Sequence, residues 1–265
     1  MFRVSKLMQA CGNRLTQSQS SDTSTSPKLL PQSTSVANYP LRSGIQPTEA
    51  QSIQQVSANY YGNPKKLDTI PEEITEAENT SVFVTNLPPD CTVTDVLSRM
   101  HGIGKIWACN TCAPTEEYLT SAMKIVFWDL AGRERLIALS KTGTFYVGSY
   151  HPEVRLNRFR TASRPWSQVS RVVGISGPTG IVNLAYLEEL FSSFGFFWEA
   201  DYFVVVSEVG DIRVAEYAFA SYLAQAETAM NCLKKHISAG HGSPGEDAYW
   251  ARVNVYWGRD PCEER

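Results

Sequence analysis

The sequence lacks any long hydrophobic run. No apolar segment approaches the roughly 20 residues that a helix needs to span a bilayer, and no apolar core follows Arg3 and Lys6 as a secretory signal would require. These absences predict an intracellular protein of the nucleus or cytoplasm that does not enter a membrane. One alternative stays open, because residues 1–21 contain no acidic residue and are weakly amphipathic, as mitochondrial transit peptides are.

Residues with metal-binding or catalytic chemistry are also scarce. The six cysteines show no repeated spacing, which argues against a disulfide framework. Cys109 and Cys112 form a single CxxC with His101 nearby, and we interpret them as reduced thiols at a strand end rather than as a metal site. The four histidines lie at neither ligand nor triad spacing. The sequence therefore predicts no enzyme, no metal, no cofactor and no small-molecule substrate.

Charge is distributed unevenly along the chain. The net charge of −3 is not that of a generally basic nucleic-acid binder. Residues 80–165 carry 10 Lys and Arg against 7 Asp and Glu, and residues 166–265 carry 7 against 13. We expect the two halves to have different electrostatic roles.

Residues 1–79 are predicted to be a disordered tail and lead-in. Ser, Thr, Gln and Pro dominate the stretch from Thr16 to about Gln55, and such a composition cannot bury enough apolar surface to offset the entropy of ordering.

From Thr80 the chain shows regular hydrophobic periodicity. Thr92 stands three residues before Asp95, as in a helix cap, and Met123, Ile125 and Phe127 alternate as one face of a strand. The pattern predicts strand, helix, strand, strand, helix, strand over residues 82–87, 93–101, 105–110, 119–128, 130–140 and 154–157.

The same order of elements then repeats. Phe127 corresponds to Phe219 at an offset of 92, and Arg155 to Arg252 at an offset of 97. A repeat of about 90 residues predicts two copies of one unit, each a ferredoxin-like βαββαβ domain of the α+β class. The second copy is expected over residues 172–176, 183–194, 197–206, 212–219, 224–237 and 251–257, with a Gly-rich loop at 239–246. The predicted boundaries are 80–160 for domain 1, 161–170 for a basic linker, 171–258 for domain 2 and 259–265 for a C-terminal tail.

The first strand, Val82-Phe83-Val84-Thr85-Asn86-Leu87, resembles the first-strand motif (RNP2) of the RNA recognition motif (RRM) family. The tandem arrangement is also similar to an expanded group of uncharacterised fungal RRM proteins. The resemblance implies that single-stranded RNA lies across the open face of a four-stranded sheet. It assigns base stacking to Phe83, with Thr85 and Asn86 beside it.

The third strand of the first unit departs from the family pattern. Ala122 and Lys124 stand where the resemblance implies two stacking rings, so we expect weak binding. Lys124 itself and three other residues are predicted to compensate in part: Trp107, Arg155 and Asn157.

A basic run follows the first unit. Arg158, Arg160 and Arg164 precede Trp166, and basic residues with interleaved aromatics favour contact with nucleic acid. The alternative is a solvated linker whose Trp166 packs between the domains.

The second unit departs further. Gly174 and Glu216 stand where the resemblance implies rings, and a carboxylate repels phosphate. This unit is therefore predicted to contact a protein or the first unit, with interface candidates Trp198, Tyr202, Arg252 and Tyr256. The alternative is that its aromatics fill the core. The sequence as a whole predicts an RNA-binding protein that acts weakly through the first sheet and the linker. The rival is a non-catalytic protein-interaction module in which neither sheet binds RNA.

Overall fold

The structure is a computed structural model that describes residues 74–239 and 243–263. The predicted disordered tail, up to residue 73, lies outside the described residues. Within these ranges, no helix has both the length and the apolar character of a membrane span. The described residues contain two four-stranded sheets, which belong to one compact unit of the chain.

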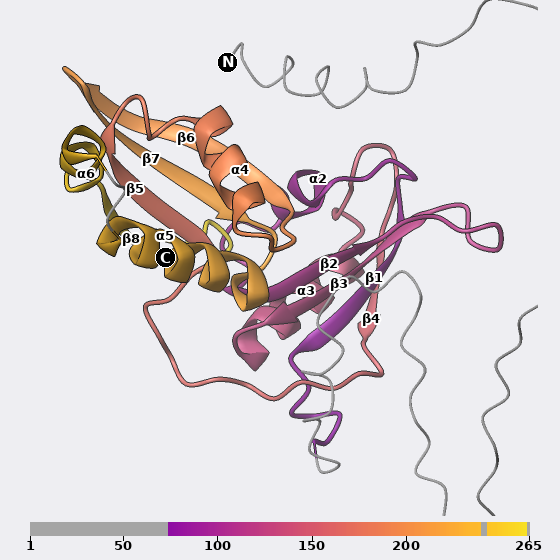
Figure 1. The fold of residues 1–265 in the computed structure, drawn as a ribbon. Helices are drawn as coiled ribbons and strands as arrows, with labels where there is room; N and C mark the ends of the chain where they lie inside the picture. Colours follow the sequence, from indigo (N-terminus) through magenta and orange to yellow (C-terminus); the bar gives the residue numbers. More distant parts are fainter. Residues whose placement is uncertain (1–73, 240–242, 264–265) are drawn as a thin grey trace, which may run out of the picture. The chain divides into compact units, whose positions relative to one another are not determined.

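The first domain has the predicted order of elements. It consists of β1 (Ser81–Leu87), α2 (Val93–Leu97), β2 (Ile106–Cys112), β3 (Ser121–Phe127), α3 (Leu130–Lys141) and β4 (Glu153–Leu156). The strands form an antiparallel sheet in the order β2-β3-β1-β4 (Figure 1). The βαββαβ prediction for this domain is confirmed.

Local chemistry explains where these elements begin and end. The Thr92 hydroxyl accepts from the Asp95 N–H while the Asp95 carboxylate accepts from the Thr92 N–H, which forms the predicted capping box. The helix is shorter than the predicted 93–101, and the chain turns at Gly102 with φ of 72°. Val82 and Val84 are fully buried against the helices, so Phe83 points to the opposite, open face of the sheet.

The second domain repeats this arrangement. Its elements are β5 (Val172–Pro178), α4 (Leu184–Ser193), β6 (Ala200–Val209), β7 (Ile212–Phe219), an irregular helical turn at Tyr222–Ala226, α5 (Glu227–Ser238), α6 (Pro244–Trp250) and β8 (Asn254–Trp257). The strand order is β6-β7-β5-β8, equivalent to that of the first domain. The two-domain prediction is therefore confirmed.

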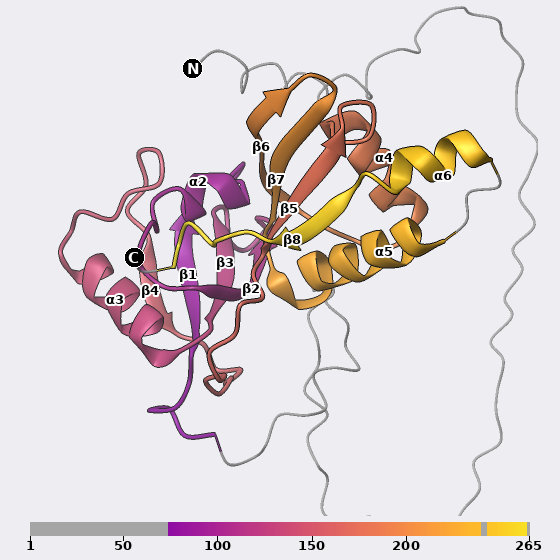
Figure 2. The same cartoon turned by 90° about the vertical axis from the view of Figure 1, so that its left-hand side faces the viewer.

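Helix α6 was not predicted, because the Gly-rich composition of residues 239–246 indicated a loop. Its start nevertheless has an ordinary helix signal. The Ser243 hydroxyl accepts from the Glu246 N–H, Pro244 occupies the first turn, and Glu246 and Asp247 add negative charge there. Figure 2 shows α6 above α5, leading directly into β8.

This extra helix changes which residues correspond on the fourth strands. Arg155 lies opposite Phe83 in the first sheet, and Tyr256 lies opposite Gly174 in the second. The predicted equivalence of Arg155 with Arg252 is therefore wrong. The residue equivalent to Arg155 is Tyr256.

The segment after β8, predicted as a tail, makes ordered contacts. The Asp260 carboxylate accepts from the Arg171 guanidinium at 2.9 Å and from the Ile106 N–H of β2, also at 2.9 Å. Arg171 also donates to Asp201 at 2.7 Å, and all three charged side chains of this cluster are buried. A second junction lies on the same strand, where Ser221 Oγ accepts from the Cys109 N–H and donates to the Cys109 carbonyl. These contacts satisfy backbone groups on the outer edge of β2.

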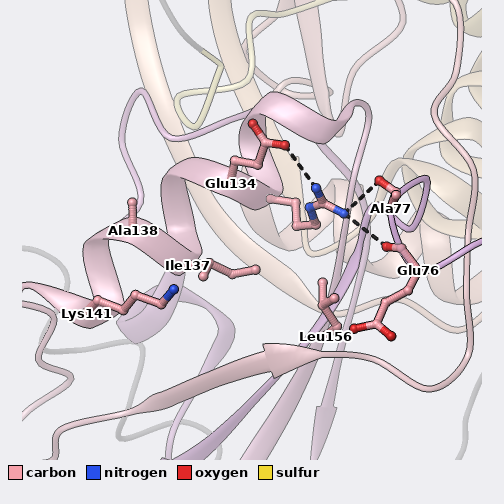
Figure 3. Close-up of a pocket in the computed structure, with 8 residues that line it drawn as sticks. Glu76, Ala77, Glu134, Ile137, Ala138, Lys141 and Leu156 are labelled. Carbon is pink, nitrogen blue, oxygen red and sulfur yellow. Dashed lines mark hydrogen bonds and ion pairs between the residues drawn. The ribbon is translucent and has the colours of Figure 1, made fainter.

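A groove of about 510 Å³ lies on the helical side of the first domain, between α3 and β4 (Figure 3). The Arg133 guanidinium donates to the carbonyls of Glu76 and Ala77 and to the Glu134 carboxylate. Because these contacts fix the segment before β1 against α3, we interpret the groove wall as structural.

Candidate nucleic-acid interface

The open face of the first sheet carries one aromatic ring between two cations. Phe83 on β1 lies opposite Lys124 on β3 and opposite Arg155 on β4, and Asn110 on β2 lies opposite Lys124. We call Arg155, Phe83, Lys124 and Asn110 the centre row. Phe83 is half-buried and Arg155 is exposed. The sequence analysis did not identify Asn110. Strict alternation from the outward Trp107 places Asn110 on the inner face of β2, but a bulge between Ile106 and Ala108 turns it to the open face.

The two cations have different surroundings. Burial lowers the pKa of the Lys124 ammonium, and its nitrogen lies 6.0 Å from the centre of the Phe159 ring. Arg155 donates to Glu153 at 2.6 Å, with both side chains largely in solvent. A surface pair of this kind is weak, so Arg155 can exchange Glu153 for another anion at small cost.

Thr85 and Asn86 lie at the end of β1. Thr85 is half-buried and continues the open face beyond Phe83. Asn86 has φ of 58° and its side-chain amide donates to the His151 carbonyl at 2.9 Å. Asn86 therefore fixes the end of the strand, and only Thr85 of the two lies on the open face.

A second row of the same face is covered. This row consists of one residue from each of β1, β3 and β2, namely Ser81, Val126 and Ala108, and we call it the linker row because the linker is attached beside it. These residues point to the open side of the sheet, yet they are only 0, 1 and 6% exposed to solvent. The linker runs past the ends of the strands here, since the Thr80 N–H donates to the Thr161 carbonyl and the Trp128 indole N–H donates to the Pro165 carbonyl. Part of the predicted RNA face is thus closed to solvent, and the linker is attached beside it.

Trp107 is not an open platform in this arrangement. The Arg164 guanidinium carbon lies 3.2 Å from the centre of the Trp107 ring, which is a close cation–π stack. Burial lowers the pKa of Arg164 to about 10, and its backbone N–H donates to the Trp128 carbonyl. The two residues predicted as RNA contacts therefore contact each other.

The other linker arginines are exposed. Arg158 lies 5.1 Å from the centre of the Phe159 ring, and Arg160 donates to the Ile74 carbonyl at 2.9 Å. Trp166 is 74% exposed, so the alternative in which it packs between the domains is wrong.

Asn157 is buried and serves the linker. Its side-chain amide donates to Ser81 Oγ at 3.1 Å, and its side-chain oxygen accepts from the Phe159 N–H. This predicted RNA contact holds the start of the linker against β1.

The second sheet supplies its ring from a different strand. Gly174 occupies the position equivalent to Phe83, opposite Glu216 on β7 and Tyr256 on β8. A Cβ built on Gly174 would lie 2.2 Å from Cε2 of Tyr256, so the Tyr256 ring fills the space over this glycine. Sequence reasoning missed this exchange because the ring lies 82 positions away from the motif.

The remaining interface candidates lie apart from one another. The Trp198 indole donates to the Tyr217 hydroxyl at 3.0 Å, and its ring packs on Phe191 in the core of the domain. Arg252 pairs with Asp211 at 2.7 Å near the surface. Tyr202 lies beside Ala218 on the open face, where burial, followed by the charge of Glu216, raises the pKa of its hydroxyl. Only Tyr202 and Tyr256 thus share the open face.

The described residues contain no group of three or more His, Cys, Asp and Glu side chains that could hold a metal ion. Burial raises the pKa of the Cys109 thiol well above its ordinary value and raises that of Cys112 as well, so both thiols stay protonated at neutral pH.

Strand order and register identify the fold. Two antiparallel βαββαβ sheets in the order 2-3-1-4, each with its first strand central beside the third, have the ferredoxin-like topology that RRM domains share. The described residues form two RRM-like folds in tandem. The central first strand is what places Phe83 and Gly174 in the middle of the two RRM faces.

Comparisons with known proteins give only distant matches. No family model matches the chain, and no curated relative matches it. Among solved structures, the three N-terminal RNA binding domains of the yeast splicing factor Prp24 match at 15% identity and a TM-score of 0.29, over 68% of this chain and 63% of that one. The two RRM domains of Drosophila melanogaster Sex-lethal match at 18% and 0.24, and those of yeast poly(U) binding protein Pub1 at 12% and 0.25. These two matches cover 68% of this chain and 100% and 99% of the others. The description of the fold therefore depends on strand order and register rather than on these matches.

Proposed function

We propose that this chain binds single-stranded RNA weakly through the open part of the first RRM sheet, and that the second sheet contacts a protein. The proposal includes an intracellular location, in the nucleus or cytoplasm. It is supported by one observation above the others, the centre row, in which Phe83 lies between Lys124 and Arg155.

This row suits a short stretch of RNA. A base can stack on the Phe83 ring, while phosphates on either side approach a cation on each neighbouring strand. Arg158 and Arg160 extend the positive charge from the end of β4 into the linker. Such contacts neutralise phosphate without reading sequence, so base preference must come from the few groups around Phe83.

Two features make the expected binding weak. The first RRM sheet has one ring in the centre row, and each missing stack forfeits about 1–3 kcal/mol. The linker row is covered, and the Trp107 ring already carries Arg164.

The test is fluorescence anisotropy of the full chain with a labelled pool of short mixed-sequence RNA at low salt. Phe83→Ala should weaken binding by about 5- to 150-fold, which corresponds to one lost stack, and should leave the fold intact because the ring points away from the core. The control is Tyr249→Ala, which removes an exposed aromatic ring from α6 of the second domain. If both variants bind as the parent does, or if the parent shows no binding at millimolar RNA, the RNA proposal fails.

The rival function is a protein-interaction module without RNA binding. The Arg164 stack on Trp107 favours it, because it withdraws an aromatic and a cation from the first sheet at once. Absence of RNA binding at low salt, where phosphate attraction is strongest, would select this rival.

A further inference from the structure

We propose that the second RRM sheet holds a cation site, in which the Tyr256 ring and the Glu216 carboxylate receive an arginine side chain of a partner protein. This inference rests on the proposed protein-contact role of that sheet and names the chemistry of the contact.

The ring and the carboxylate are neighbours on one face. Tyr256 and Glu216 flank Gly174 from the two adjacent strands. A carboxylate oxygen of Glu216 lies 3.4 Å from where a Cβ on Gly258 would stand. Gly258 follows Tyr256 by two positions, so the Glu216 side chain reaches across β5 towards the strand that carries the Tyr256 ring, and that ring lies over Gly174 between the two strands.

In the part of the chain that the structure describes, no group donates to the Glu216 carboxylate. No hydrogen bond or ion pair there involves Glu216, whereas Arg213 on the same strand is paired with Glu208 at 2.7 Å. Partial burial raises the pKa of Glu216, as expected for a carboxylate that has lost water without gaining a partner. A bound cation would supply the missing donors.

The surroundings favour arginine over RNA. Residues 166–265 carry 7 basic against 13 acidic residues, so phosphate is repelled and a cation attracted. A guanidinium can donate two parallel hydrogen bonds to the carboxylate and stack on the 40% exposed Tyr256 ring at the same time. Val204, which lies opposite Glu216 and is 43% exposed, provides apolar surface for the arginine methylene groups.

The probe is an acetylated, amidated peptide with three Arg residues separated by Gly, added to the full chain with ¹³C-labelled tyrosine. We expect the Tyr256 ring signals to shift on titration. A peptide with citrulline in place of arginine has the same shape without the charge and should bind at least about tenfold more weakly. Glu216→Gln should weaken binding of the arginine peptide by about tenfold, or about 1.4 kcal/mol. The control Glu189→Gln makes the same change in net charge on the exposed side of α4 and should change the affinity by less than about twofold.

Each other outcome would overturn the site. Equal binding of the arginine and citrulline peptides would exclude a cation site but leave the protein-contact role standing. Equal losses in Glu216→Gln and Glu189→Gln would show that only net charge matters. No shift at millimolar peptide would mean that the face takes no arginine, and larger Tyr256 shifts with single-stranded RNA would overturn both the cation site and the protein-contact role. RNA binding at Phe83 is measured on other signals, so it is judged separately.

Discussion

Replacing Arg164 by alanine tests whether this linker residue binds phosphate or covers the Trp107 ring, because the two roles predict opposite changes in RNA affinity. An arginine that contacts phosphate adds affinity, and its loss weakens binding. Arg164 instead lies on the Trp107 ring and is partly buried. We therefore expect Arg164→Ala to strengthen RNA binding, because it frees a ring on the first sheet.

The magnitude follows from the geometry. A cation–π contact as close as 3.2 Å in a partly desolvated position is worth about 1–2 kcal/mol. Losing it makes the linker easier to displace by a factor of about 5 to 30. A base that stacks on the uncovered Trp107 would gain about 1–3 kcal/mol, so we expect affinity to rise by about fivefold or more.

The assay is the same anisotropy titration, repeated at several salt concentrations. Arg164→Lys is the matched control, since it keeps the charge but loses the planar stack, and it should also bind more tightly than the parent. Arg158→Ala, at an exposed position, should weaken binding and flatten the salt slope by about one phosphate contact. Weaker binding and a flatter slope for Arg164→Ala would refute the reasoning and return Arg164 to phosphate contact.

Two further changes test the second domain. Asp260→Asn removes the charge that pairs with buried Arg171 and should lower the free energy of unfolding by about 3–5 kcal/mol in urea titrations. The control Asp211→Asn changes a solvent-exposed pair and should leave the urea midpoint nearly unchanged; equal effects of the two variants would contradict this prediction. Gly174→Ala should lower the free energy of unfolding by about 1–3 kcal/mol, because the new methyl group overlaps the Tyr256 ring. Most of this loss should disappear when Tyr256 is also replaced by Ala; additive losses in the double variant would mean that the ring does not fill this space.

The fold was predictable where local patterns carry the information. Val82 and Val84 alternate with outward residues, and Thr92 with Asp95 marks a helix start, so the order of elements followed from the sequence. Helix α6 was missed because glycines around a good N-cap indicated a loop.

The candidate site was less predictable because its state depends on contacts between distant segments. Phe83 was placed on the open face correctly. Neither the Arg164 stack on Trp107 nor the Tyr256 ring over Gly174 can be read from spacing, since each joins residues more than 50 positions apart. A motif match shows which residue stands at a strand position, but not which side chain from a distant segment packs over that position.

The Asp260 bond to the Ile106 N–H has a consequence for synthesis of the chain on the ribosome. The two residues are 154 positions apart, so at 5–20 residues per second the partner of this strand edge emerges about 8 to 30 seconds after the strand itself. Ser221, which bonds to Cys109 on the same edge, emerges earlier, so the Ile106 end of β2 is the last part of this edge to be covered. We therefore expect this end of β2 to be able to pair with another extended chain until Asp260 has emerged.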